Sequence, residues 1–294
     1  MTSRALCALL LALASPAAAQ EAAPQATAPA APEAAATEQA IPEDIRALFE
    51  AMRLPDILGA IAAEGRADGD ELAGTIFRAG PVPSTWGRML EAIYDPEHME
   101  AEMLASLGRA LEGEDTAAML AFFDSEPGRR IVAQEVETRL ALSEEDAEQE
   151  AREAAAVALA EGSARVELLR RYVEALDLVE YNVVGALNSN YAYVSGLLDG
   201  GALGQGMTEG DILSDIWSQE GEIRADTTEW VLAFLLQAYE PLPDQDIEAL
   251  IAFSETEPGQ ALNAAIFDAF DERFNSISRA LGLASARYMT TEEL

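Results

Sequence analysis

Apolar side chains recur at steps of three and four residues along most of this chain. One run consists of Ile45, Leu48, Phe49 and Met52, and a later one of Leu168, Leu169, Tyr172, Val173 and Leu176. This period places the apolar residues on one face of an amphipathic helix. No segment alternates strictly enough to predict a strand, and residues 188–194 are expected to continue a helix. We therefore predict an all-α fold, a helical bundle or array.

Proline, serine and aspartate mark the expected helix starts. Pro42 suits a first helical turn, and Pro55 is expected to open a second, short helix. Ser84, Asp95 and Asp115 are candidate N-caps, because their side-chain oxygens can accept hydrogen bonds from the free N–H groups of a first turn. The pattern predicts helices of about 10–20 residues joined by short loops.

Two segments of the chain are similar at an offset of 131 residues, 117–131 and 248–262. The first reads AAMLAFFDSEPGRRI and the second EALIAFSETEPGQAL. The shared corner consists of Phe122, Ser125, Pro127 and Gly128 in the first copy and Phe253, Thr256, Pro258 and Gly259 in the second. We predict two related helical halves, 41–160 and 164–290, with repeat motifs at 103–136 and 231–270.

The repeated corner has a structural and a functional interpretation. Ser125 or Thr256 can cap the following helix, and proline needs no hydrogen-bond donor in a first turn. Glycine leaves room where two helices meet closely. A helix start also attracts anions, which would make the corner a ligand site, although the local acids would repel them. The structural interpretation, a corner that fixes the fold, is favoured.

The corner motif, in an all-helical chain with an export signal, resembles the domain of unknown function 2059 family. Segments 122–128 and 253–259 would each be the core motif of one copy, and residues 48–58 resemble the helix that often precedes the domain. One departure is the order Ser-Glu-Pro-Gly, where the family more often places proline directly after serine or threonine. The resemblance implies two tandem copies in an exported bacterial protein, and it implies no chemistry.

The N-terminus reads as a secretory signal peptide, residues 1–19. Arg4 precedes an apolar run at 5–15, and small residues at 17–19 form a cleavage site after Ala19. The run is shorter than the roughly 20 residues of a membrane anchor. Cleavage removes Cys7, so the mature protein has no thiol. Residues 20–40, rich in Ala, Pro, Glu and Gln, predict a disordered linker. The expected location is periplasmic or secreted.

Composition excludes several classes of site. The chain has 53 acidic and 18 basic residues and a formal net charge of −35, and every basic residue is arginine. Without lysine there is no Schiff-base enzyme and no phosphate loop ending in Gly-Lys. His98 is the single histidine, so no zinc finger can form. The segment that begins at Asp68 resembles the start of a calcium-binding loop, but Ala79 occupies the position of the closing glutamate. We expect no cofactor, no metal and no nucleic-acid partner.

Aromatic and amide side chains supply the candidate binding residues. Trp86, Trp217 and Trp230 are expected to be core anchors rather than a platform for sugars. A second group of residues forms a candidate ligand patch. It consists of Tyr181, Asn188, Asn190, Tyr191 and Tyr193. This patch is interpreted either as a packing seam between the two halves or as a polar groove for a small ligand or peptide.

The sequence favours an exported, non-catalytic protein that binds a small ligand or a partner in the bacterial envelope. The alternative is a carboxylate-dependent hydrolase of cell-envelope material, which needs a buried acid of raised pKa in a cleft. Asp177 and Glu180 are the candidate acids for that alternative, and His98 is expected at the surface. A third possibility is a structural acidic protein that binds divalent ions diffusely.

Overall fold

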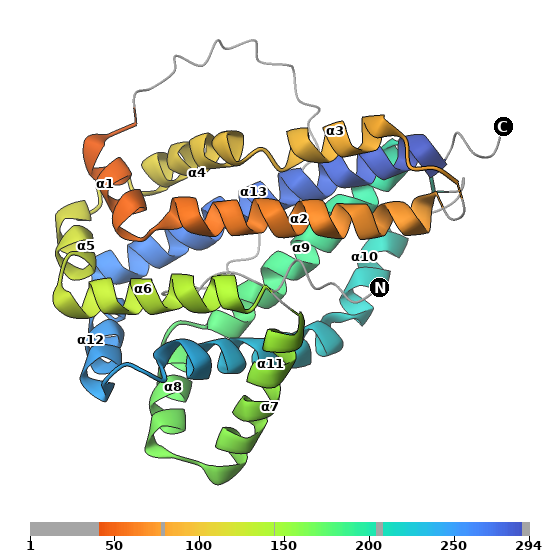
Figure 1. The fold of residues 1–294 in the computed structure, drawn as a ribbon. Helices are drawn as coiled ribbons and strands as arrows, with labels where there is room; N and C mark the ends of the chain where they lie inside the picture. Colours follow the sequence, from red (N-terminus) through yellow and green to blue (C-terminus); the bar gives the residue numbers. More distant parts are fainter. Residues whose placement is uncertain (1–40, 78–79, 144, 204–207, 290–294) are drawn as a thin grey trace.

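The computed structural model describes residues 41–77, 80–143, 145–203 and 208–289 (Figure 1). The predicted signal peptide and linker lie outside these residues. The helices are α1 (Glu43–Ala51), α2 (Leu54–Ile76), α3 (Ser84–Ile93), α4 (Pro96–Ala110), α5 (Thr116–Phe123), α6 (Glu126–Ala141), α7 (Glu145–Glu161), α8 (Ala164–Ala175), α9 (Leu178–Asp199), α10 (Glu209–Ser218), α11 (Glu220–Tyr239), α12 (Asp244–Ser254) and α13 (Glu257–Met289). No strand occurs in the described residues, so the predicted all-α fold is confirmed.

The helix starts follow the sequence signals with two differences. The carboxylates of Asp95 and Asp115 accept hydrogen bonds from backbone N–H groups two and three residues later, as predicted for N-caps. Ser84 does not cap α3, because Pro83 occupies the N-cap position and Ser84 is already helical. Pro55 does lie in the first turn of α2, but that helix is not short, since it runs for 23 residues. Of the helices described, none is both long and apolar enough to cross a membrane.

The two repeated corners have the same geometry. The Ser125 hydroxyl accepts a hydrogen bond from Gly128 N–H at 3.1 Å, and the Thr256 hydroxyl accepts one from Gly259 N–H at 3.1 Å. A Cβ atom on either glycine would lie 2.2 Å from the carbonyl oxygen of the phenylalanine six residues earlier. Glycine is therefore required for α5 to meet α6 and for α12 to meet α13. The chain itself fills both corners, which supports the structural interpretation of this motif.

Two features of the helices before α7 recur in the helices after it. Arg53, between α1 and α2, and Asp177, between α8 and α9, both adopt left-handed backbone conformations, with φ of 53° and 46°. The rings of Phe122 and Phe253, which are equivalent in the repeat, stack at 4.3 Å with planes 3° apart. The largest cluster of buried side chains takes residues from α1 through to α13. The two halves therefore share one core, with α7 and α8 forming a hairpin at one end of the molecule (Figure 1).

The long helices α9 and α13 form the closest helix pair. A Cβ atom on Gly196 would lie 2.4 Å from the carbonyl oxygen of Arg279, and one on Gly282 would lie 2.2 Å from that of Tyr193. The two backbones thus touch where these glycines face each other, without intervening side chains. This contact fixes the position of α9 against the C-terminal helix.

The end of α13 completes the core of the first half. The ring of Tyr288 packs edge-on against Phe77 at 5.0 Å and Trp86 at 5.7 Å. Its hydroxyl and that of Thr85 lie 2.7 Å apart in a hydrogen bond between residues 203 positions apart in sequence. The buried Trp86 indole also donates to the carbonyl oxygen of Gly69 on α2. The last helix therefore holds α2 and α3 together.

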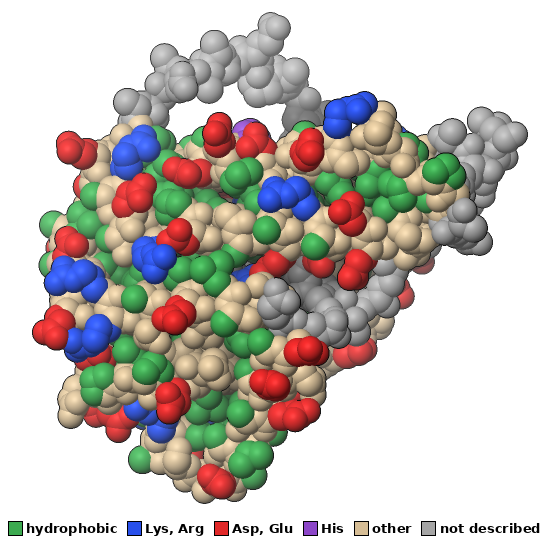
Figure 2. Space-filling view, viewed as in Figure 1, with side chains coloured by type: hydrophobic (Ala, Val, Ile, Leu, Met, Phe, Trp, Pro, Cys, Tyr) green, Lys and Arg blue, Asp and Glu red, His purple; other side chains and the backbone are tan. Residues whose placement is uncertain are grey.

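The surface carries charges of both signs, unevenly distributed. On the face shown in Figure 2, arginine side chains lie among the acidic ones. Several arginines of the protein link distant helices, such as Arg130 of α6 with Asp246 of α12 at 2.8 Å. The chain has no Lys, Arg or His between Arg171 and Arg224, a span that includes α9 and α10. The charged side chains of these two helices are therefore all acidic.

Candidate functional site

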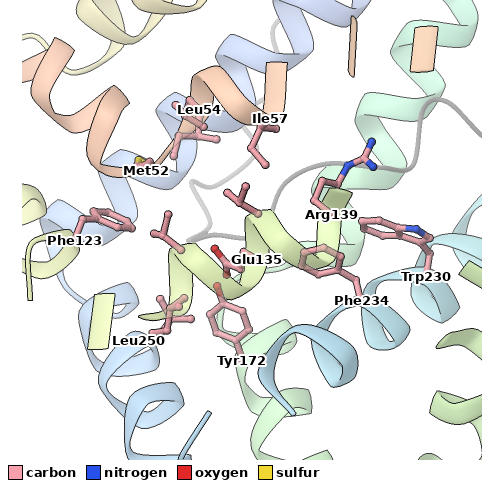
Figure 3. Close-up of a pocket in the computed structure, with 14 residues that line it drawn as sticks. Met52, Leu54, Ile57, Phe123, Glu135, Arg139, Tyr172, Trp230, Phe234 and Leu250 are labelled. Atoms are coloured by element: carbon pink, nitrogen blue, oxygen red, sulfur yellow. The ribbon is translucent and has the colours of Figure 1, made fainter. Parts of the chain in front are cut away.

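A cavity of about 70 Å³ lies in the shared core, where helices from both halves meet (Figure 3). Most of its lining is apolar. The residues that line it are Met52, Leu54, Ile57, Phe123, Ile131, Val132, Glu135, Val136, Arg139, Tyr172, Trp230, Phe234, Leu250 and Ile266. An apolar lining with a few polar groups is typical of ligand sites, although this cavity is smaller than most of them.

Helix α6 places the polar residues of the cavity. Ile131, Val132, Glu135, Val136 and Arg139 recur at steps of three and four, so they share the face of α6 that turns inward. Glu135 thus stands at a position of the helix that otherwise carries core side chains. At the repeat offset of 131 its counterpart is an isoleucine, which lines the same cavity from α13.

Glu135 is half-buried, with its carboxyl turned toward the cavity. Burial raises its pKa from 4.5 to about 7, although a hydrogen bond from Tyr239 acts in the opposite direction. The Tyr239 hydroxyl, from the end of α11, donates to Glu135 Oε1 at 2.5 Å. Near neutral pH this carboxyl therefore exchanges between a neutral acid, which can donate a hydrogen bond, and a carboxylate, which can only accept one.

Tyr172 of α8 adds a second hydroxyl beside Glu135. Its side chain is fully buried, and in Figure 3 the hydroxyl points toward Glu135. The Tyr239 hydroxyl interacts with it and lowers its pKa, but no described group makes a hydrogen bond of normal geometry to it. Burial and the nearby Glu135 charge raise the Tyr172 pKa well above its usual value. A buried polar group without a partner costs free energy, so this hydroxyl is suited to meet a ligand or a water molecule.

Arg139 closes the other end of the cavity. Its guanidinium points away from Glu135 in Figure 3 and makes two hydrogen bonds to the Glu64 carboxylate of α2, one of them at 2.7 Å. The Arg139 side chain is 4% exposed and that of Glu64 is 23% exposed. The pair therefore ties α6 to α2 beside the cavity.

Among the residues that line the cavity, Glu135 is the single acid. Hydrolysis of a glycosidic bond ordinarily uses two carboxyl groups on either side of the bond. One carboxyl with two tyrosine hydroxyls can bind a polar group or exchange a proton with it.

The predicted ligand patch on α9 is divided between two neighbours. Tyr181 stacks on Phe267 of α13 at 4.4 Å, and Asn188 donates to Asp271 of α13 at 3.1 Å. Tyr191 instead donates to Glu209 of α10 at 2.7 Å. These contacts pack α9 against other helices of the second half, so the residues do not form a seam between the two halves. The two remaining residues of the patch, Asn190 and Tyr193, are half-buried on the same helix.

The acids selected for a hydrolase lie at the surface. Asp177 and Glu180 are both exposed, and Glu180 pairs with Arg224 at 2.7 Å. His98 is exposed as well, 3.4 Å from Glu102 on the same helix. The acid of raised pKa that the hydrolase interpretation needed is the half-buried Glu135, which is not among the predicted candidates.

Two of the three tryptophans are core anchors, and one is not. Trp86 is 0% exposed and Trp230 is 5% exposed, as expected. Trp217 is 62% exposed, so the prediction that it anchors the core is wrong. On α10 the inward positions are taken by Ile212 and Ile216, and Trp217 falls one residue beyond them.

Among the described residues, no group of three or more His, Cys, Asp or Glu side chains is arranged to hold a metal ion. No protein-family model matches this chain, and no characterised protein and no solved structure is similar to it.

Proposed function

We propose that this chain is an exported, non-catalytic protein that binds a small molecule in the bacterial envelope space. The observation that carries the proposal is the Glu135 cavity, an apolar pocket with one carboxyl and with the Tyr172 hydroxyl, which makes no hydrogen bond of normal geometry. Export, with cleavage after Ala19, rests on the N-terminal sequence pattern. Membership of the domain of unknown function 2059 family rests on the corner motif and stays a prediction.

The dimensions of the cavity limit the ligand. About 70 Å³ corresponds to roughly two water molecules, at about 30 Å³ each, or to a small organic molecule of a few heavy atoms. The apolar lining favours an alkyl group at one end of that molecule. Glu135 favours an N–H or O–H donor at the other end. A short-chain amine or alcohol has this chemistry.

Native mass spectrometry of the mature protein, purified from its own periplasm without denaturation, tests the proposal first. We expect extra mass from a bound molecule. Val136→Phe, which fills the cavity, should remove that mass, and the control Glu137→Gln, on the exposed side of α6, should retain it. An adduct that survives Val136→Phe would place the ligand elsewhere.

Titration with n-butylamine and n-butanol at pH 8 tests the ligand class. Trp230 lines the cavity, so its fluorescence should change on binding. We expect Glu135→Gln to weaken binding of the amine more than that of the alcohol, since only the amine gains from the carboxylate charge. No binding of either probe, together with an empty mass spectrum, would refute a ligand function for this cavity.

The second candidate, a carboxylate-dependent hydrolase, is favoured by one observation, the raised pKa of Glu135. Against it stand the single carboxyl and the small chamber. Turnover of envelope glycan that is lost in Glu135→Gln and retained in Glu137→Gln would establish this alternative and overturn the non-catalytic proposal.

A further inference from the structure

Helices α9 and α10 enclose an apolar cluster apart from the main core. Its buried members are Val183 and Leu187 of α9 and Ile212 and Ile216 of α10. This small cluster holds α10 against α9. It also leaves apolar side chains of the same two helices on the outside.

Helix α10 carries two exposed apolar side chains, which we call the α10 face. They are Leu213, 39% exposed, and Trp217, 62% exposed, and Val184 of the neighbouring α9 is 41% exposed. Leu213 and Trp217 are four residues apart, so they lie on one side of α10. Trp217 is the most exposed of the large apolar side chains described in this protein. Exposed tryptophan on a helix is typical of surfaces that bind other proteins.

Every charged side chain of α9 and α10 is acidic. Glu209, Asp211 and Asp215 of α10 are exposed, as are Glu180 of α9 and Glu222 of α11. Arg224 is the first cation after Arg171, and its guanidinium is already engaged by the carboxylates of Glu180 and Glu220. The rim of the face therefore has an unbalanced negative charge.

We propose that the α10 face docks a basic amphipathic helical segment of a partner protein. The apolar side of such a segment would cover Trp217 and Leu213, and its Arg or Lys side chains would meet the acidic rim. A second copy of this chain would bring the same acids against each other, and an anionic lipid surface would be repelled in the same way. Charge complementarity thus selects a cationic partner. This surface is independent of the Glu135 cavity.

A synthetic amphipathic helix of leucine and lysine tests the proposal, with a scrambled peptide of the same composition as its control. Trp86 and Trp230 are buried, so Trp217 is the tryptophan whose emission can shift on contact. We expect the amphipathic peptide to shift this emission to shorter wavelength and to bind about tenfold or more tightly than the scrambled one. Added salt should weaken binding without abolishing it.

Substitutions of exposed residues separate the apolar contribution to peptide binding from the electrostatic one. Trp217→Ala, measured by calorimetry, should weaken binding of the amphipathic peptide by about tenfold or more. Asp215→Asn should weaken it less and reduce its salt dependence. Val157→Ser, which changes an equally exposed residue on α7, should leave binding unchanged.

Two results would overturn the proposal. The first is equal binding of both peptides with no effect of Trp217→Ala, which would reduce the interaction to net charge. The second is dimerisation of the protein that Trp217→Ala abolishes, which would assign the face to a second copy of the chain. Neither result would bear on the cavity, because Trp217 does not line it.

Discussion

Replacing Glu135 with glutamine should make this protein more stable above neutral pH. Glutamine keeps the size of the side chain and an oxygen that can accept the hydrogen bond from Tyr239, but it cannot ionise. The substitution therefore removes one term from the free energy of unfolding, the cost of holding a carboxylate in the cavity.

The sign and size follow from the Glu135 pKa, which rises from 4.5 to about 7 on burial. A raised carboxyl pKa means that the folded protein binds the proton more tightly than the unfolded chain does. Stability is therefore retained at low pH and lost as pH rises from about 4.5 to 7. At about 1.4 kcal/mol per pH unit, the complete loss is about 3 kcal/mol. Between pH 5 and pH 8 the wild type should lose about 2.5 kcal/mol through this group.

Urea unfolding of both proteins at pH 5 and pH 8 measures this loss. The many other acids also titrate, so the quantity of interest is the difference between wild type and variant at each pH. We expect that difference to shift by about 2.5 kcal/mol in favour of Glu135→Gln at pH 8. Glu137→Gln, on the exposed side of α6, should show no such shift. A difference that is the same at both pH values would mean that Glu135 ionises freely in the folded state, which would refute the reasoning.

Three further substitutions test the packing by urea unfolding. Gly282→Ala should lower the free energy of unfolding by about 1–3 kcal/mol, because its new Cβ would lie 2.2 Å from a carbonyl oxygen. Gly221→Ala, with open space around it, should instead stabilise α11 by a few tenths of a kcal/mol or more. Equal effects of the two substitutions would contradict the close α9–α13 contact. Ser125→Ala should cost about 1 kcal/mol by removing the cap of α6, and no loss would show that the cap is dispensable. Arg139→Met should lower the free energy of unfolding by about 3–5 kcal/mol, because it leaves the Glu64 carboxylate unpaired. Adding Glu64→Gln to this variant should restore part of the lost stability.

The sequence predicted the elements and corners well because their causes are local. Capping by Asp95, Asp115 and Ser125 depends on residues two or three positions away. The corner glycines likewise face a carbonyl oxygen only six residues earlier. The residues of one short segment are therefore enough to predict the caps and the corners.

The candidate site could not be predicted in the same way, because its residues come from distant segments. Glu135, Tyr172 and Tyr239 meet from α6, α8 and α11. A signal was present, since Glu135 interrupts the inward stripe of α6, but periodicity does not tell a solvated acid from a buried one. The five residues of the α9 patch lie on one helix but do not form a single surface. Its pattern indicated which side chains share a helix, and the covering helices α10 and α13 decided what each one contacts.

The Tyr288 contact has a consequence for biogenesis. The aromatic cluster around Trp86 is completed by a side chain that the ribosome adds near the end of synthesis. The first half therefore cannot reach its native packing until almost the whole chain is available, and contacts of such long sequence separation form slowly. This delay helps a chain that must cross a membrane in an unfolded state, because its early segments remain unfolded until they have crossed. Late closure of the core would therefore favour the export that we propose for this chain.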